Sequence, residues 1–186
     1  MNSQATREAL DVLISEERIA MRTRELAEAI RGDLGEENVL LIGVLKGSVM
    51  FLADLARQLG LNVEMDFVQV SSYGAGKSTS GIVQIRKDLD INIEGRNVLI
   101  VEDIVDTGIT LSHLRELFGT RKPKSLRVVS LLSKPEARRL QTPVEYIGFE
   151  IPNEFVVGYG LDFAERYRNL PYIAVLREAP SPSPLV

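Results

Sequence analysis

The sequence predicts an α/β domain with a central, mostly parallel sheet flanked by helices. The chain has 186 residues, which is about the size of one domain. Residues 39–45 (VLLIGVL) form a continuous apolar run, the pattern of a parallel strand that is covered on both faces. Strand-like and helix-like segments then alternate through the middle of the chain, as they do in parallel sheets whose connections are helices.

The first helix is expected to begin at Ser15. This residue is a favourable N-cap, and Glu16 and Glu17 after it suit the positive end of a helix. Apolar side chains then recur at helical spacing up to Gly32, where we expect the helix to end. A second helix is expected after the strand at 39–45, from about residue 48 to residue 59.

The next strand covers residues 63–67. Its apolar side chains alternate with Glu64 and Asp66, so we expect one of its faces to meet water or a polar site. The stretch 71–81 breaks all periodicity, and a strand resumes at 82–85.

A second fully apolar strand covers residues 98–101 (VLIV) and is expected to end at two acidic residues. Helical spacing follows it at Leu111, Leu114, Leu117 and Phe118. Further strands are expected at residues 126–132, 144–149, 155–159 and 173–176. Because no strong helix separates the short strands after Pro143, these strands predict a small β appendage beside the main sheet.

We expect one domain at residues 1–178 and a disordered tail at 179–186. The tail contains the run APSPSP, whose prolines can sustain neither a helix nor a ladder of strand hydrogen bonds.

The composition excludes several classes of site. Cysteine is absent from the sequence, so the chain has no disulfide, zinc–thiolate site or cysteine nucleophile. A net charge of -4 provides no global positive field for nucleic acid, so any phosphate binding has to be local. The first residues lack the apolar core of a signal peptide, and no apolar run approaches membrane-spanning length. We therefore expect a cytoplasmic protein that binds neither nucleic acid nor membrane.

Acidic and hydroxyl side chains gather directly after the strand at 98–101. Glu102, Asp103 and Asp106 repel one another unless backbone donors, hydroxyl groups or a cation compensate. The carboxyl ends of parallel strands are where α/β sheets bind ligands. Residues 106–110 (DTGIT), here called the phosphate loop, open a helix whose free N–H groups suit a phosphate. The structural alternative is that Asp106 and Thr107 cap this helix and that Glu102 and Asp103 are solvated.

Residues 98–110 (VLIVEDIVDTGIT) resemble the phosphoribosyl diphosphate motif of the type I phosphoribosyltransferases, and the chain up to about Leu176 resembles their hypoxanthine-guanine branch. The resemblance implies the fold of that family, with a small hood from the chain ends and a flexible loop. It implies that Glu102 and Asp103 hold the ribose hydroxyls and, with Asp162, Mg²⁺. The 5′-phosphate is assigned to Asp106, Thr107, Gly108, Ile109 and Thr110. Asp106 would also accept a proton near the purine N7.

Two further segments match the same family. Leu45, Lys46 and Gly47, here called the diphosphate loop, resemble its pyrophosphate-binding turn, which has a non-proline cis peptide between the leucine and the lysine. Ser72 and Tyr73 open a glycine- and serine-rich stretch that matches its flexible loop, which closes over the reactants. Taken alone, Lys46 would be an ordinary exposed lysine and Gly47 a turn residue.

Residues 74–79 (GAGKST) superficially suggest a nucleotide-binding P-loop. That pattern needs a glycine at position 71, where Ser71 stands, and a helix afterwards, where a strand is expected. We therefore reject the P-loop.

The purine half of the site is carried by later residues. The resemblance implies that Lys134 donates to the 6-oxo group, that Phe155 stacks on the base and that the Val156 backbone contacts its edge. Asp162 is placed beside the base and near Mg²⁺, and Arg168 at the diphosphate. Taken separately, Phe155 and Val156 would be core residues and Arg168 a solvated charge.

The expected activity is the transfer of a 5-phosphoribosyl group from 5-phospho-α-D-ribose 1-diphosphate to N9 of hypoxanthine or guanine, with Mg²⁺ as cofactor. Lys134 favours a 6-oxo over a 6-amino purine because an ammonium group only donates hydrogen bonds. Xanthine remains an open acceptor. The alternative is a regulatory protein of this fold that senses the diphosphosugar and binds nucleic acid. The family usually forms dimers or tetramers, so we expect a homodimer or homotetramer.

Overall fold

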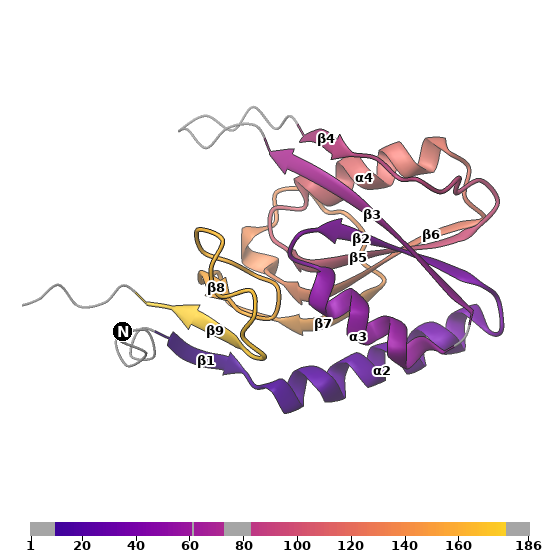
Figure 1. Cartoon of the computed structure of the whole chain (residues 1–186). Coiled ribbons are helices and arrows are strands. Elements are labelled where there is room, and N and C mark those ends of the chain that lie inside the picture. The colour runs from indigo at the N-terminus through magenta and orange to yellow at the C-terminus, as the bar shows by residue number, and fades with distance from the viewer. Residues whose placement is uncertain (1–9, 61, 73–82, 178–186) are drawn as a thin grey trace, which may run out of the picture.

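The computed structural model describes residues 10–60, 62–72 and 83–177 and contains a six-stranded sheet (Figure 1). Five neighbouring strands are parallel, and the edge strand β4 runs antiparallel to β3. In spatial order the sheet consists of β4 (Val83–Lys87), β3 (Val63–Ser72), β2 (Val39–Leu45), β5 (Asn97–Val105), β6 (Ser125–Ser133) and β7 (Tyr146–Glu150). The mostly parallel sheet expected from the two apolar runs is confirmed.

Helices cover both faces of this sheet (Figure 1). One face packs against α2 (Glu16–Leu34) and α3 (Val49–Leu59), whose buried residues include Ile30 and Phe51. The other face packs against α4 (Ile109–Thr120) through Leu114 and Phe118. The strands between the helices are therefore apolar on both sides, which is why β2 reads as an uninterrupted hydrophobic run.

A second, three-stranded antiparallel sheet forms from both ends of the chain. It contains β1 (Leu10–Ile14), β9 (Ile173–Leu176) and β8 (Val156–Val157), in that order. Figure 1 shows this sheet at the end of the main sheet toward which the parallel strands point. We call β1, β8, β9 and residues 158–172 the hood. The expected β appendage is confirmed for β8 and β9. The strand expected at 144–149 was also assigned to it, but it is β7 of the main sheet because it pairs in parallel with β6. The sequence pattern did not reveal β1.

Several boundaries differ from the expected ones. The first helix passes through Gly32 and ends at Leu34, with Gly35 at φ 63° as its C-cap. β5 runs beyond the apolar segment to Val105 because it keeps pairing with β6. The strand expected at 155–159 is reduced to β8. Tyr73 and the tail at 179–186 lie outside the described residues.

The polar face expected of β3 is confirmed, because Glu64 is exposed and Asp66 lies in a buried polar site. The carboxylate of Asp66 binds the connection after β4. It accepts hydrogen bonds from the backbone N–H groups of Phe67 (2.7 Å), Asp90 (2.8 Å) and Ile91 (2.9 Å), and Lys87 Nζ lies 3.6 Å away. Burial raises the pKa of Asp66, but the hydrogen bonds from Ile91, Phe67 and Asp90 outweigh it and lower the pKa overall.

Replacing Asp66 with asparagine should lower the free energy of unfolding by about 2 kcal/mol at neutral pH, because charge-assisted hydrogen bonds are lost. A carboxylate whose pKa is depressed by folding stabilises the protein above its ordinary pKa and loses that effect as the pH falls through the lowered value. Urea unfolding at decreasing pH should therefore show the two proteins converging. A stability difference that stays constant down to acid pH would contradict this role.

Candidate active site

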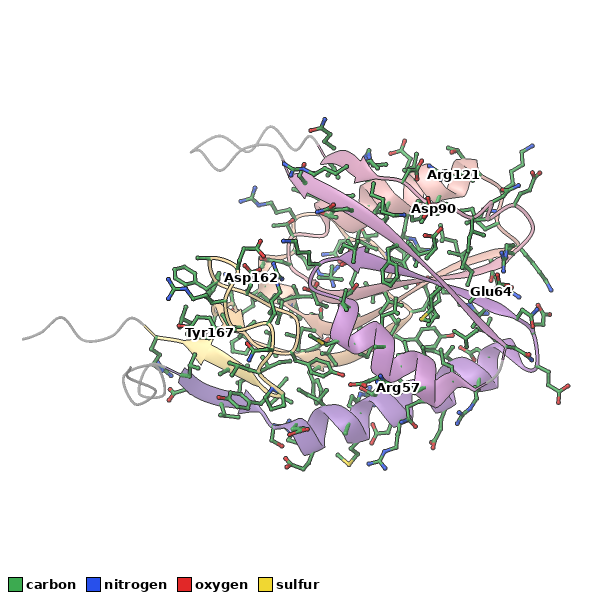
Figure 2. All side chains as sticks on the ribbon, in the orientation of Figure 1. Arg57, Glu64, Asp90, Arg121, Asp162 and Tyr167 are labelled. Atoms are coloured by element: carbon green, nitrogen blue, oxygen red, sulfur yellow. The ribbon has the colours of Figure 1, made fainter. Side chains whose placement is uncertain are left out.

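The expected site residues come from four segments that meet where the parallel strands end. These segments are the connection from β2 to α3, the end of β5 with the phosphate loop, the end of β6, and the hood. In Figure 2, Asp162 and Tyr167 mark the part of the hood that lies there. The topology therefore joins positions that are more than one hundred residues apart in the sequence.

The diphosphate loop packs tightly against β5 and the hood. The Leu45–Lys46 peptide bond is cis. A Cβ atom on Gly47 would lie 1.6 Å from Asp103 Oδ2, and one on Gly160 would lie 1.9 Å from the carbonyl oxygen of Gly47. Both positions therefore require glycine.

Glu102 and Asp103 lie on β5 itself, as successive residues whose side chains point to opposite faces of the sheet. Asp103 faces the diphosphate loop, and Glu102 lines a cavity of about 100 Å³ beside the phosphate loop. Glu102 is only 5% exposed, and burial, followed by the charge of Asp103, raises its pKa well above the ordinary value. Burial also raises the pKa of Asp103 to about 6, against hydrogen bonds from the N–H groups of Ile104 and Asp103 and the charge of Arg168. The negative charges of Glu102 and Asp103 are thus only partly offset by hydrogen bonds and nearby cations.

The phosphate loop leaves the start of α4 open. The N-cap is Gly108, at φ 81°, and it makes no side-chain capping bond. Asp106 is exposed, and Thr107 Oγ1 accepts only a long 3.4 Å bond from Ile109 N. The alternative in which Asp106 caps the helix therefore does not apply. The positive end of the helix therefore lies beside the cavity that Thr107, Gly108 and Thr110 line.

The connection after β6 supports this loop, a contact that the sequence pattern did not reveal. The N–H groups of Arg139 and Leu140 donate to the Thr107 carbonyl at 3.0 and 3.1 Å. A Cβ atom on Gly108 would lie 2.7 Å from the Leu140 carbonyl oxygen. Residues 139–140 therefore hold the phosphate loop in place, although they contain no motif that the sequence analysis could use.

The residues expected at the purine come from the end of β6 and from the start of β8. Lys134 directly follows β6, is 7% exposed, and its backbone N–H donates to the Val105 carbonyl at 3.0 Å. Val156 is buried in β8. Phe155 is 52% exposed, and its ring makes an edge-to-face contact with Phe163, whose centroid is 5.8 Å away. Phe163 was not anticipated, because a lone aromatic residue carries no signal.

Arg168 is held in the hood by two short contacts. Its Nη1 donates to the Gly160 carbonyl at 2.7 Å, and its Nη2 lies 2.8 Å from Asp162 Oδ1. Glu165 was also missed by the sequence analysis, and its carboxylate lies 3.0 Å from Lys46 Nζ. Within residues 10–60, 62–72 and 83–177, no group of three or more His, Cys, Asp or Glu side chains is arranged to hold a metal ion. Glu102, Asp103 and Asp162 thus form no preassembled cage.

A larger cavity, of about 340 Å³, lies between α2, α3 and the hood. Asp54, Tyr159 and Arg168 line it, but none of the acids of β5 and none of the phosphate loop does. The acids of β5 and the phosphate loop therefore lie outside this cavity, whereas Arg168 borders it. None of the helices in the described part of the chain combines the length and the hydrophobicity of a membrane-spanning segment.

Comparison with known proteins agrees with this arrangement. The model of the phosphoribosyl transferase domain family matches residues 11–164. The hypoxanthine-guanine phosphoribosyltransferase of Bacillus subtilis (strain 168) is 53% identical over 168 residues, which are 90% of this chain and 93% of the relative. The crystal structure of a hypoxanthine-guanine phosphoribosyltransferase from Bacillus anthracis has a TM-score of 0.85 at 50% identity and covers 89% of this chain and 97% of its own. A hypoxanthine phosphoribosyltransferase from Staphylococcus aureus has a TM-score of 0.89 at 44% identity, with 95% and 97% coverage.

Proposed function

The chain belongs to the phosphoribosyltransferase family, in its hypoxanthine-guanine branch, and we propose from this premise that it is a purine salvage enzyme. It transfers a 5-phosphoribosyl group from 5-phospho-α-D-ribose 1-diphosphate to N9 of hypoxanthine or guanine and releases pyrophosphate. The observation that carries the proposal is the convergence of the two β5 acids, the open phosphate loop and Lys134 at one end of the sheet. The regulatory alternative has no support, because the similar proteins are named as transferases.

The diphosphosugar is proposed to bind across three of the four segments. The N–H groups of the phosphate loop hold the 5′-phosphate, since the start of α4 has no side-chain cap at Gly108. Ile109 contributes only its backbone to this cradle. Glu102 and Asp103 hold the ribose hydroxyls. Leu45, Lys46 and Gly47 meet the diphosphate from one side and Arg168 meets it from the other.

The residues present fit Mg²⁺. Glu102 and Asp103 are carboxylates with raised pKa values, so a nearby cation would relieve the cost of charging them. Mg²⁺ is usually held by one or two carboxylates, waters and substrate phosphate oxygens, so no protein cage is needed. Asp162 belongs to the same set. When bound, Mg²⁺ neutralises part of the charge of the diphosphate.

The base is proposed to lie against Phe155, with Lys134 Nζ donating to its 6-oxo group and the Val156 backbone and Asp162 at its edge. Departure of pyrophosphate leaves C1′ positively charged, and N9 attacks that carbon. Asp106 accepts or shares the N7 proton as the new bond forms, which its exposed position beside the cavity allows. Lys46 and Arg168 stabilise the leaving group.

The proposal is tested by steady-state kinetics on the full chain with the donor, Mg²⁺ and each purine base. Hypoxanthine and guanine should be converted to their nucleotides, and adenine should not. Absence of turnover with every 6-oxopurine would overturn the proposed function.

We further propose that the protein is a cytoplasmic homodimer or homotetramer. The exposed apolar side chains of Met21, Val49 and Met50 on α2 and α3 are in keeping with a contact between subunits.

Replacing Lys134 with methionine should raise the KM for hypoxanthine at least about tenfold, because a charge-assisted hydrogen bond contributes roughly 1.5–3 kcal/mol. The KM for the diphosphosugar should change little. Lys124→Met is a matched control, since Lys124 is exposed and pairs with Glu37 away from the site. An equal rise in both KM values would indicate a general structural role for Lys134.

A further inference from the structure

The carboxylate of Glu165 lies between the two cations proposed to bind diphosphate. Lys46 Nζ is 3.0 Å from Glu165 Oε2, and Arg168 Nη2 is 3.5 Å from the same oxygen. Lys46 comes from the diphosphate loop and Arg168 from the hood, so one anionic oxygen joins the two walls of the site.

The hood holds Glu165 in this position through its backbone. Glu165 N donates to Asp162 Oδ2 at 2.9 Å. Ala164 and Glu165 have φ values of 51° and 62°, in the left-handed region that side chains other than glycine rarely adopt. Unfavourable backbone of this kind persists where the surrounding structure imposes it. The backbone conformation of residues 164–165 therefore places the Glu165 side chain beside Lys46 and Arg168.

A carboxylate oxygen at this place makes the same kind of contact as a diphosphate oxygen, because both accept hydrogen bonds from ammonium and guanidinium groups. We propose that Glu165 is an internal competitor of diphosphate. Its carboxylate occupies the position of the diphosphate in the free protein and moves away when the diphosphosugar or pyrophosphate binds. This inference rests on the proposed function and adds a residue that tunes affinity at the same site.

The competition is expected to be weak enough for a substrate to win. The side chains of Lys46 and Glu165 are 55% and 65% exposed, and exposed ion pairs have small interaction energies. Removing the competing charge should strengthen diphosphate binding by about two- to fivefold. In the natural protein the contact therefore weakens the binding of donor and of pyrophosphate alike, which helps the product to leave.

The test is the affinity of E165Q for pyrophosphate in the presence of Mg²⁺, measured by titration calorimetry on the full chain. The variant keeps the length of the side chain but removes its charge, so its Kd should be about two- to fivefold lower than that of the wild type. E165D keeps the charge but is one methylene shorter, and its Kd should shift in the same direction. Glu28→Gln, an exposed position on α2, is the matched control and should bind pyrophosphate as the wild type does.

Unchanged or weaker binding by E165Q would overturn the inference, and so would wild-type affinity in E165D, because the contact with Lys46 would then not set the affinity. The KM for the donor should fall in E165Q while the KM for hypoxanthine stays constant. Turnover by the wild type is measured in the same series. Its absence would reject the proposed function, whereas normal wild-type turnover with no effect in E165Q would reject only the role of Glu165.

Discussion

Replacing Asp106 with asparagine should lower the turnover number for hypoxanthine by about 100-fold or more, because general base catalysis typically contributes 10²–10⁴-fold. The amide has the same size but cannot accept the N7 proton. Asp106 is exposed and does not cap α4, so its loss should leave the fold and the KM for the donor nearly unchanged. Steady-state kinetics with saturating donor measures the effect directly.

A suitable control for Asp106→Asn is Glu136→Gln, which removes one charge from the exposed connection after β6. This variant should turn over at the wild-type rate. If Asp106→Asn also retained near-normal turnover, the proton would have to leave through solvent, and Asp106 would have no part in the chemistry.

Replacing Gly47 with alanine should lower kcat/KM for the diphosphosugar by about 100-fold, since a displacement of about 1 Å in a reacting group can cost that much. The added Cβ would lie 1.6 Å from Asp103 Oδ2, so either the diphosphate loop or the acid has to move. The loop also contacts Gly160 in the hood, which restricts the direction of that movement. The KM for the diphosphosugar should therefore change more than the KM for the purine base.

Gly32→Ala is the matched control for Gly47→Ala. Gly32 lies inside α2, and a Cβ atom there would have no neighbour within 4 Å apart from the backbone of its own helix, so alanine should leave activity unchanged and stabilise the helix by up to about 1 kcal/mol. Thermal unfolding of both variants shows whether the fold has survived. A folded Gly47→Ala protein with wild-type kinetics would mean that the contact between this loop and Asp103 is unimportant.

The fold could be predicted to the extent that local patterns decide it. The apolar runs of β2 and β5 are unambiguous because both faces of these strands are covered by helices. β1 was missed because a short strand at the edge is defined by its partner β9, which lies some 160 residues later in the chain. The helix end expected at Gly32 was wrong because a glycine on an exposed helix face lowers helix stability only a little, and the C-cap is Gly35.

The candidate site was predictable where its residues are contiguous in the sequence. The phosphate loop follows a buried strand and opens a helix, so sequence and topology specify it together. Alternation along β3 identified its polar face, but it could not show which groups cover Asp66, because they come from the connection after β4. Glu165 and Phe163 are single residues whose partners come from other segments, so only the folded chain reveals them.

The pairing of β1 with β9 also determines the order in which parts of the protein can fold during synthesis. As the chain leaves the ribosome, residues 10–14 have no strand to pair with until residues 173–176 emerge. The ends of β2 and β5, with the ribose acids and the phosphate loop, can form much earlier than β8, whose Val156 pairs with Val175. A nascent or truncated chain that stops short of β9 thus has the ribose acids and the phosphate loop but no ordered place for the base. In such a chain β1 also has no partner strand.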